Sequence, residues 1–248
     1  MTNAIELRQV TKCFGGRCAV HEVTLDVPRG EIFGFLGPNG AGKTTIIKLM
    51  CGLLRPSAGT VRVLGEDPVA PDATVRRRIA YIPDSPYIYE RLTAAEFFDF
   101  VGQLYGVPAD QTARQREEWF DRFELTEAAD MLIRDFSHGM RQRLIYASAL
   151  LREPEIFFVD EPFIGLDPKG IRLIKTLLRE RARAGATVFL TTHLLALIET
   201  LADRVGILRH GRLMACAPIA TLRTLSRGTG SLEDIYLDLT GADHEPVV

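Results

Sequence analysis

A glycine-rich segment, GPNGAGKT at residues 37–44, restricts the possible folds more than any other part of the chain. It fits the pattern G-x-x-x-x-G-K-[ST], and it lies between the apolar run EIFGFLG (31–37), which predicts a buried strand, and TTIIKLMCGLL (44–54), which has helical spacing. Such a loop wraps a phosphate chain with backbone N–H groups, while Lys43 reaches the β- and γ-phosphates and the Thr44 hydroxyl can bind Mg²⁺. We therefore predict a nucleoside triphosphate site that includes Gly37, Pro38, Asn39, Gly40, Ala41, Gly42, Lys43, Thr44 and Thr45.

The arrangement of the other apolar segments predicts an α/β fold. EIFFVDEP (155–162) and ATVFLTTH (186–193) have the composition of buried strands, and an amphipathic helix is predicted between them over 171–185. Strands that alternate with helices predict a parallel sheet, whose ligands bind beyond the carboxyl ends of the strands. Segments 4–14 and 20–27 instead alternate apolar and polar residues around a two-glycine turn, which predicts two half-buried strands.

Residues 86–153 differ in composition from the segments on either side. They contain Pro-Tyr and Gly-Val-Pro breaks and helical patterns at 93–106 and 113–125. We interpret them as a helical subdomain inserted into a nucleotide-binding core of residues 1–85 and 154–225, with residues 226–248 as a C-terminal helix or tail. The expected fold is a P-loop NTPase core with a mainly parallel sheet, an N-terminal antiparallel β subdomain and an inserted α-helical subdomain.

Polar residues follow two of the predicted strands at the ends where ligands bind. Asp160 and Glu161 end the segment FFVDE, and His193 ends the segment 186–193. A strand-end aspartate in P-loop NTPases holds Mg²⁺ through its water shell, and an adjacent glutamate can activate water as a general base. We expect His193 to sense the γ-phosphate. Phe14, before the two-glycine turn, either stacks on a purine or is an ordinary core aromatic.

The composition excludes several classes of protein. Thirty basic and 32 acidic residues give a net charge of −2, so no positive field recruits nucleic acid. The N-terminus does not resemble a signal peptide, and no apolar stretch approaches the ~18 residues of a membrane span, so we expect a soluble chain. The cysteines include no CxxC pair, and this argues against zinc and disulfides and for reduced thiols at Cys13, Cys18, Cys51 and Cys216.

The segment FSHGMRQRL (136–144) opens a further predicted helix. Ser137 stands at the cap position, and Gly139 allows close approach of a ligand to the backbone. A helix start of this kind is either a plain cap or a site for an anion, and the residues alone leave both open.

The order of these motifs resembles that of the ATP-binding subunits of ABC transporters over nearly the whole chain. The resemblance rests on Phe14, the loop 37–45, YIPDSP (81–86), FSHGMRQRL, FFVDEP, GLDP (165–168) and His193. It implies that the nucleotide is ATP, that ATP is hydrolysed with Mg²⁺, and that two such domains dock head to tail. Ser137, His138 and Gly139 would then contact the γ-phosphate of ATP held by Lys43 of the other protomer, and Asp167 would lie in a loop that touches the opposite site.

The resemblance also implies a role for each site residue. The catalytic residues would be Lys43, Glu161 and His193, and the metal-binding residues would be Thr44, Asp84 and Asp160. Asp84 stands where the family usually has glutamine, and its shorter side chain is expected to reach Mg²⁺ through water. His138 and Met140 replace the usual glycine and glutamine of the signature, a variation that is similar to ABC-2-type exporters, as is the segment 230–241.

The partners implied are an integral membrane permease and a second copy of the chain or a paralogous ATP-binding subunit, without nucleic acid. The chain would lie at the cytoplasmic face of the membrane, with a docking surface that includes PYIYERL (86–92). Tyr87, Ile88, Tyr89 and Leu92 either anchor that interface or pack inside the lobe. The alternatives are a soluble ABC-type ATPase that acts on ribosomes or DNA, and a non-catalytic nucleotide-sensing module, which would lack Glu161 or Lys43.

Overall fold

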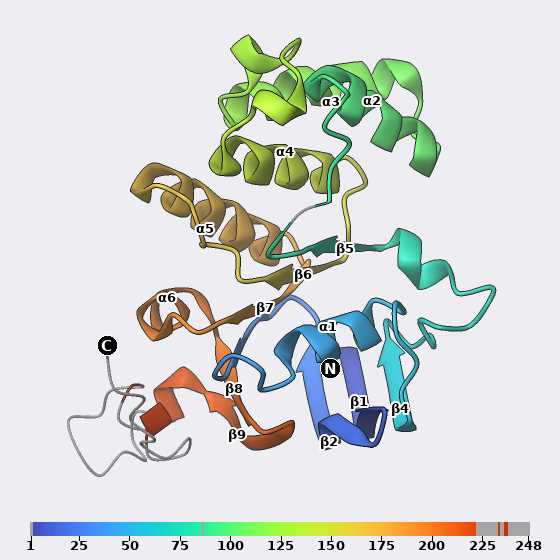
Figure 1. Ribbon diagram of the computed structural model, residues 1–248, viewed down its shortest axis with the longest axis vertical. Coiled ribbons are helices and arrows are strands. Elements are labelled where there is room, and N and C mark those ends of the chain that lie inside the picture. Colours follow the sequence, from blue (N-terminus) through green and yellow to red (C-terminus); the bar gives the residue numbers. More distant parts are fainter. Residues whose placement is uncertain (1, 86, 222–232, 234–235, 238–248) are drawn as a thin grey trace.

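A computed structural model describes residues 2–85, 87–221, 233, 236 and 237, and these form two sheets with helices around them (Figure 1). The smaller sheet is antiparallel and has the order β2-β1-β4, with bounds β1 Asn3–Phe14, β2 Arg17–Pro28 and β4 Ala58–Val63. The predicted N-terminal strand pair is thereby confirmed. Its third strand, β4, was not expected.

The larger sheet has six strands in the order β5-β6-β7-β3-β8-β9. The first five run parallel, and β8 and β9 form an antiparallel hairpin at one edge. Their bounds are β3 Ile32–Leu36, β5 Ile79–Ile82, β6 Ile156–Asp160, β7 Thr187–Thr192, β8 Arg204–Arg209 and β9 Arg212–Pro218. The fold is the expected α/β class with a mainly parallel sheet.

The central strands are buried on both faces, which explains their continuous apolar sequences. Every residue of β3, β6 and β7 is buried. Ile32 and Leu36 of β3 belong to the core on the side of the helical lobe, whereas Phe33 and Phe35 belong to the core beneath the antiparallel sheet. A Cβ at Gly34 would lie 2.7 Å from Ile198 Cδ1 and 3.2 Å from Ala202 Cβ, so the absence of a side chain here lets the helix that contains Ile198 pack closely on this strand.

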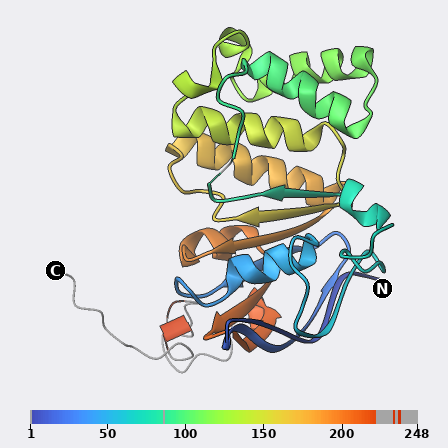
Figure 2. The same ribbon diagram turned by 45° about the vertical axis from the view of Figure 1, so that its right-hand side comes forward.

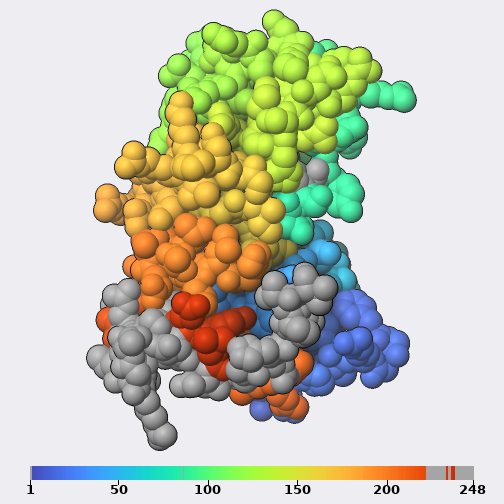
Figure 3. Space-filling view, turned by 60° about the vertical axis from the view of Figure 1, so that its left-hand side comes forward, coloured from blue at the N-terminus to red at the C-terminus, as the bar shows by residue number. Residues whose placement is uncertain are grey.

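The helices cover both faces of the larger sheet. Helix α1 (Lys43–Met50) contacts the antiparallel sheet, and α5 (Pro168–Arg183) and α6 (Leu195–Leu201) contact β3 from the other face. Figure 1 shows α1 and the helices α5 and α6 on opposite sides of the strands β6 and β7. In the space-filling view, the yellow and orange surface of α5 and α6 continues directly into the green surface of the lobe (Figure 3).

The lobe contains α2 (Ala94–Tyr105), α3 (Ala109–Arg122) and α4 (His138–Leu150) (Figure 1). Helix α2 begins with a capping box between Thr93 and Glu96, and it ends at Gly106, whose φ of +72° suits glycine. Short 3₁₀ turns lie at η1 (Thr74–Arg77), η2 (Thr126–Ala128) and η3 (Ile133–Asp135). The hydrophobic core of the lobe continues without a break into the core of the sheet.

The structure overturns the expectation of four reduced thiols, because Cys13 and Cys18 form a disulfide. The two residues face each other in the register of β1 and β2, on either side of the turn with the two glycines. This pairing depends on the register of the hairpin, which spacing rules for metal sites do not capture. Cys51 and Cys216 are free thiols.

Among the described residues, no helix is long and apolar enough to span a membrane. Most of the predicted C-terminal segment 226–248 lies outside the described residues, as does most of the segment 230–241.

Candidate functional site

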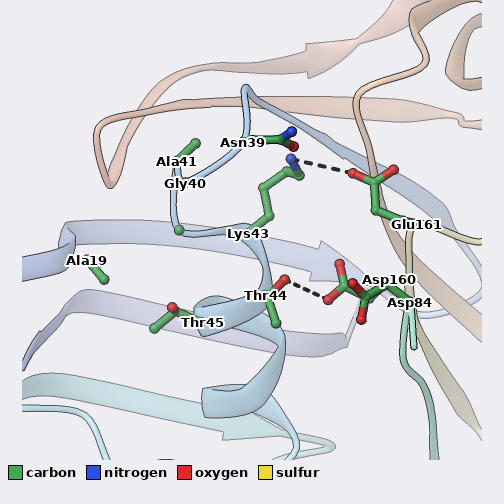
Figure 4. A pocket seen from close by; sticks show the side chains of 11 residues that line it. Ala19, Asn39, Gly40, Ala41, Lys43, Thr44, Thr45, Asp84, Asp160 and Glu161 are labelled. Atoms are coloured by element: carbon green, nitrogen blue, oxygen red, sulfur yellow. Dashed lines mark hydrogen bonds and ion pairs between the residues drawn. The ribbon is translucent and has the colours of Figure 1, made fainter. Parts of the chain in front are cut away.

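The register of the parallel strands brings the predicted motifs to one edge of the sheet. Leu36 of β3 pairs with Thr192 of β7, and Asp160 of β6 pairs with Thr191. The phosphate loop, Glu161 and His193 follow these strand ends directly, so segments far apart in sequence meet at one edge of the sheet. Figure 4 shows the phosphate loop and Glu161 facing each other there. This edge is where an α/β sheet binds its ligand.

A pocket of about 240 Å³ lies at this edge. Its lining consists of Ala19, Asn39, Gly40, Ala41, Gly42, Lys43, Thr44, Thr45, Asp84, Asp160 and Glu161 (Figure 4). A Cβ at Gly42 would lie 2.4 Å from the Ala19 carbonyl oxygen, and its φ is +107°, so only glycine allows the loop to pack on β2. Helix α1 begins without a side-chain cap, which leaves its first N–H groups for phosphate oxygens.

Lys43 is held in place at the bottom of the loop. Its side chain is 7% exposed, and its Nζ donates hydrogen bonds to the carbonyl oxygens of Gly37 (2.8 Å) and Pro38 (3.3 Å). The same ammonium lies 3.5 Å from Glu161 Oε1. A buried cation at this point suits the negative charge of a β- or γ-phosphate.

Asp160 connects the loop to the sheet. Its Oδ2 accepts a hydrogen bond of 2.7 Å from the Thr44 hydroxyl, and its Oδ1 accepts one from the Thr191 hydroxyl. Asp160 is 1% exposed, whereas Asp84 is exposed and lines the same pocket. Figure 4 shows the hydrogen bond between Thr44 and Asp160, with Asp84 in the lining of the same pocket. Oxygen donors gathered in this way fit Mg²⁺, which keeps several waters and takes few protein ligands.

Glu161 lies between two other polar groups. Its Oε2 is 3.1 Å from His193 Nδ1, and its Oε1 faces Lys43. The side chain is 11% exposed, and the backbone has a φ of +47°, which is uncommon for a non-glycine residue and is often found at functional sites. The carboxylate thus lies between an ammonium and an imidazole in the lining of the pocket, and a carboxylate in such a place can serve as a general base.

Phe14 lies outside the pocket lining. Its side chain is exposed, and the Lys12 ammonium is 5.0 Å from the centre of its ring. The exposure argues against the core alternative. The β1–β2 hairpin that carries Phe14 also supplies Ala19 to the pocket, so the ring is attached to the same element.

The signature segment does not join this pocket within one chain. Ser137 caps α4 by accepting a hydrogen bond of 3.2 Å from the Met140 N–H, and the pocket lining includes neither Ser137, His138 nor Gly139. Figures 1 and 2 show strands β5 and β6 between α4 and α1. Asp167 caps α5 in the same way, accepting from the Gly170 N–H at 2.8 Å.

Sequence reasoning missed two residues of the site. Thr191 holds Asp160, and Ala19 forms the wall behind Gly42. Thr191 could have been found from its place in TTH, because a hydroxyl in a buried strand requires a hydrogen-bond partner. Ala19 gives no signal in the sequence, because its contribution comes from its backbone carbonyl.

Comparison with known proteins places the chain in a family. Residues 20–164 match the family model described as ABC transporter. The chain is 40% identical over 214 residues to the daunorubicin/doxorubicin resistance ATP-binding protein DrrA of Streptomyces peucetius, covering 86% of this chain and 65% of that protein. It is 37% identical over 231 residues to the bacitracin transport ATP-binding protein BcrA of Bacillus licheniformis, covering 92% of this chain and 74% of BcrA.

A solved structure described as an ATP-binding subunit of an ABC transporter has a TM-score of 0.89 and 33% identity, covering 96% of this chain and 99% of that one. The match to DrrA spans less than two thirds of the length of DrrA. The chain belongs to the ABC transporter ATP-binding family, whose members bind and hydrolyse ATP.

Proposed function

We propose that this chain is the ATP-hydrolysing subunit of an ABC transporter of the exporter type and acts with a separate membrane permease. The observation that carries the proposal is the position of Glu161, which lies between Lys43 and His193 at the mouth of the phosphate pocket. The functions of similar proteins support the exporter type, since these proteins include drug resistance, bacitracin transport and Nod factor export ATP-binding proteins.

The residues of the site divide the chemistry among them. Lys43 and the N–H groups of the loop bind the phosphates, and Glu161 orients the attacking water and takes its proton. Mg²⁺, held near Thr44 and Asp160 with Asp84 reaching it through water, would offset charge on the β- and γ-phosphate oxygens. His193 supports Glu161 and faces the γ-phosphate.

We infer that the site is completed by a second protomer. Ser137 and His138 are exposed, and a Cβ at Gly139 would make only ordinary contacts of 3.8 Å or more within the chain. The packing of the chain therefore does not require glycine at this position, which supports a role for Gly139 toward a partner. In the head-to-tail dimer, Ser137, His138 and Gly139 would contact the ATP held by Lys43 of the other copy or of a paralogue.

The permease would dock on the lobe, at the cytoplasmic face of the membrane. Tyr87 is 99% exposed and Tyr89 is 61% exposed, whereas Ile88 and Leu92 pack against the core. Of the four candidate anchors, the two tyrosines are therefore available to a partner. Exposed aromatic rings of this kind are frequent anchors of protein interfaces.

Two variants test the dimer and the catalytic base. Glu161→Gln should keep ATP binding, stop turnover and form an ATP-dependent dimer in light scattering. Ser137→Arg should abolish hydrolysis while the isolated chain keeps its ATP affinity, because the new side chain blocks the ATP site of the other protomer. Thr126→Arg, which adds the same side chain to exposed lobe surface, is the control and should behave as wild type. A solitary chain with full turnover at any protein concentration would refute the dimer.

Copurification from membranes tests the transporter assignment. The tagged chain should bring down an integral membrane protein. Cofractionation with ribosomes or DNA would instead support the alternative function.

A further inference from the structure

A second pocket, on the side of the lobe away from the phosphate site, contains two arginines that form no ion pair within the part of the chain that the structure describes. It has a volume of about 230 Å³ and is lined by Arg77, Tyr105, Val107, Gln111, Leu151, Arg152 and Glu153. Arg152 follows the end of α4, and Arg77 ends η1, just before β5. In Figure 2 the C-terminal end of α4 and the turn before β5 lie on the same side of the molecule.

Arg152 is held in an unfavourable environment. Its guanidinium carbon lies 3.7 Å from the centre of the Tyr105 ring, and its Nε and Nη1 are buried without a hydrogen-bond partner among the described residues. Burial lowers the pKa of Arg152 below its ordinary value. Buried N–H donors without an acceptor are costly, and stacking on an aromatic ring offsets only part of that cost. An acceptor from outside the chain would supply what is missing.

Three other half-buried arginines of the described chain form ion pairs: Arg116 with Asp99, Arg143 with Glu124, and Arg204 with Glu31. Arg181 does not; its guanidinium carbon lies 5.2 Å from the centre of the Trp119 ring, and its Nε is buried without an acceptor among the described residues. Arg152 differs from Arg181 in that its Nη1 also lacks an acceptor. Arg77 and Arg152 form no ion pair with any described residue, although Glu153 lines the same pocket. The pocket therefore keeps an unneutralised positive charge.

Exposed apolar side chains also occur along α2, between Tyr89 and this pocket. The Tyr89 and Phe100 rings meet edge to face at 5.4 Å, and Leu104, one turn further along α2, is 64% exposed. Tyr105 comes next and forms the wall on which Arg152 stacks. A helix with an apolar face and one acidic side chain would match both parts of this surface.

We propose that the Arg77–Arg152 pocket binds an aspartate or glutamate side chain of the permease's cytoplasmic segment. This inference rests on the proposed function, because it names the partner chemistry of the same transporter. A guanidinium offers parallel N–H donors that match the two oxygens of a carboxylate, and other side chains do not reproduce this geometry. A lipid surface is less suitable, since it favours clusters of several basic residues rather than one recessed guanidinium.

The first experiment locates the occupant. A p-benzoylphenylalanine residue at Gln111, on the rim of the pocket, is photoactivated in native membranes, and the cross-linked peptide is sequenced by mass spectrometry. The expected peptide is a cytoplasmic segment of an integral membrane protein with an acidic residue. A cross-link only to lipid, or to a segment without Asp or Glu, would overturn the inference.

The second experiment tests the charge. Arg152→Glu should reduce the copurified permease by about tenfold or more, as expected when one partner of a recessed charge pair is removed. Replacing the cross-linked acid of the permease by arginine should restore the complex. If Arg152→Glu folds poorly, the same copurification is measured with Arg152→Gln. Arg183→Glu, on an exposed position of α5, is the matched control. Unchanged ATP affinity of each isolated variant confirms that it is folded.

The outcomes separate this inference from the proposed function. If the wild-type chain brings down no membrane protein, the transporter assignment fails. If the wild type does so and Arg152→Glu and Arg152→Gln do so equally well, only the carboxylate pocket fails. Binding of phosphatidylglycerol vesicles that depends on Arg152 would assign the pocket to lipid phosphate and would also overturn the inference.

Discussion

The contact between Lys43 and Glu161 predicts that the Glu161 carboxylate competes with the phosphates of ATP for the lysine. The two side chains are 7% and 11% exposed and lie 3.5 Å apart, so the pair is largely removed from solvent. At an effective dielectric constant of about 20, the Coulomb attraction at this distance is about 5 kcal/mol. Loss of hydration offsets most of it, which leaves about 1–2 kcal/mol.

Glu161→Gln should remove this competition and strengthen nucleotide binding. The amide keeps the shape of the side chain, and Lys43 keeps its hydrogen bonds to Gly37 and Pro38. The loss of about 1–2 kcal/mol of ion-pair energy between Lys43 and residue 161 corresponds to about 5- to 30-fold tighter nucleotide binding. Removal of the carboxylate from the neighbourhood of the γ-phosphate acts in the same direction.

The measurement is the Kd of a non-hydrolysable ATP analogue, obtained by equilibrium dialysis at protein concentrations where light scattering shows only the single chain. Glu155→Gln is the control, since Glu155 pairs with Arg78 and Arg29 outside the pocket. The control should change the Kd by less than about twofold, because exposed pairs contribute little. Equal or weaker binding by Glu161→Gln would refute the reasoning.

Four further predictions follow from other parts of the chain. Asp160→Asn should lower the ATPase rate by at least about 100-fold and remove the Mg²⁺ dependence of nucleotide affinity, because the carboxylate that receives the Thr44 and Thr191 hydroxyls is lost; full activity would exclude a metal role. Tyr146→Phe should raise the free energy of unfolding in urea by about 1 kcal/mol, because the Tyr146 hydroxyl is buried without a partner; a loss of stability would contradict this. A non-reducing peptide map should link Cys13 to Cys18, and Cys51 should resist iodoacetamide in the native state, since burial raises the pKa of its thiol. Burial also raises the pKa of Glu31 above 4.5. The contribution of Glu31 to the free energy of unfolding is therefore fully present below pH 4.5 and is lost as the pH rises through the folded-state pKa. In urea titrations at several pH values, Glu31→Gln should show a smaller decrease in the free energy of unfolding over this pH range than the wild type.

Local patterns in the sequence were sufficient to predict the phosphate loop and the strand-end residues. The glycine loop between a strand and a helix is a short-range signal, and the buried strands of the parallel sheet have continuous apolar sequences. The common edge for Lys43, Glu161 and His193 followed from parallel topology alone.

Features that depend on pairing between distant segments could not be predicted in the same way. Strand β4 pairs with β1 from about fifty residues away, and its first three residues are exposed, so its sequence carries little strand signal. The disulfide depends on irregular register near Cys13, where β1 contains a shift between Lys12 and Cys13. The contacts of Glu161 require side-chain geometry that no spacing rule supplies.

Helix α4 links the two surfaces that we propose for partners. It begins at the Ser137 cap and ends at Leu150, just before Arg152, so its 13 residues extend for about 20 Å. Leu144, Tyr146 and Ala147 hold it in the core along its length. Because a packed helix of this length does not bend easily, a displacement of one end moves the other end as well. Binding of a neighbour's ATP at the first end of α4 and binding of a permease carboxylate next to its last residue would therefore be mechanically coupled through the helix.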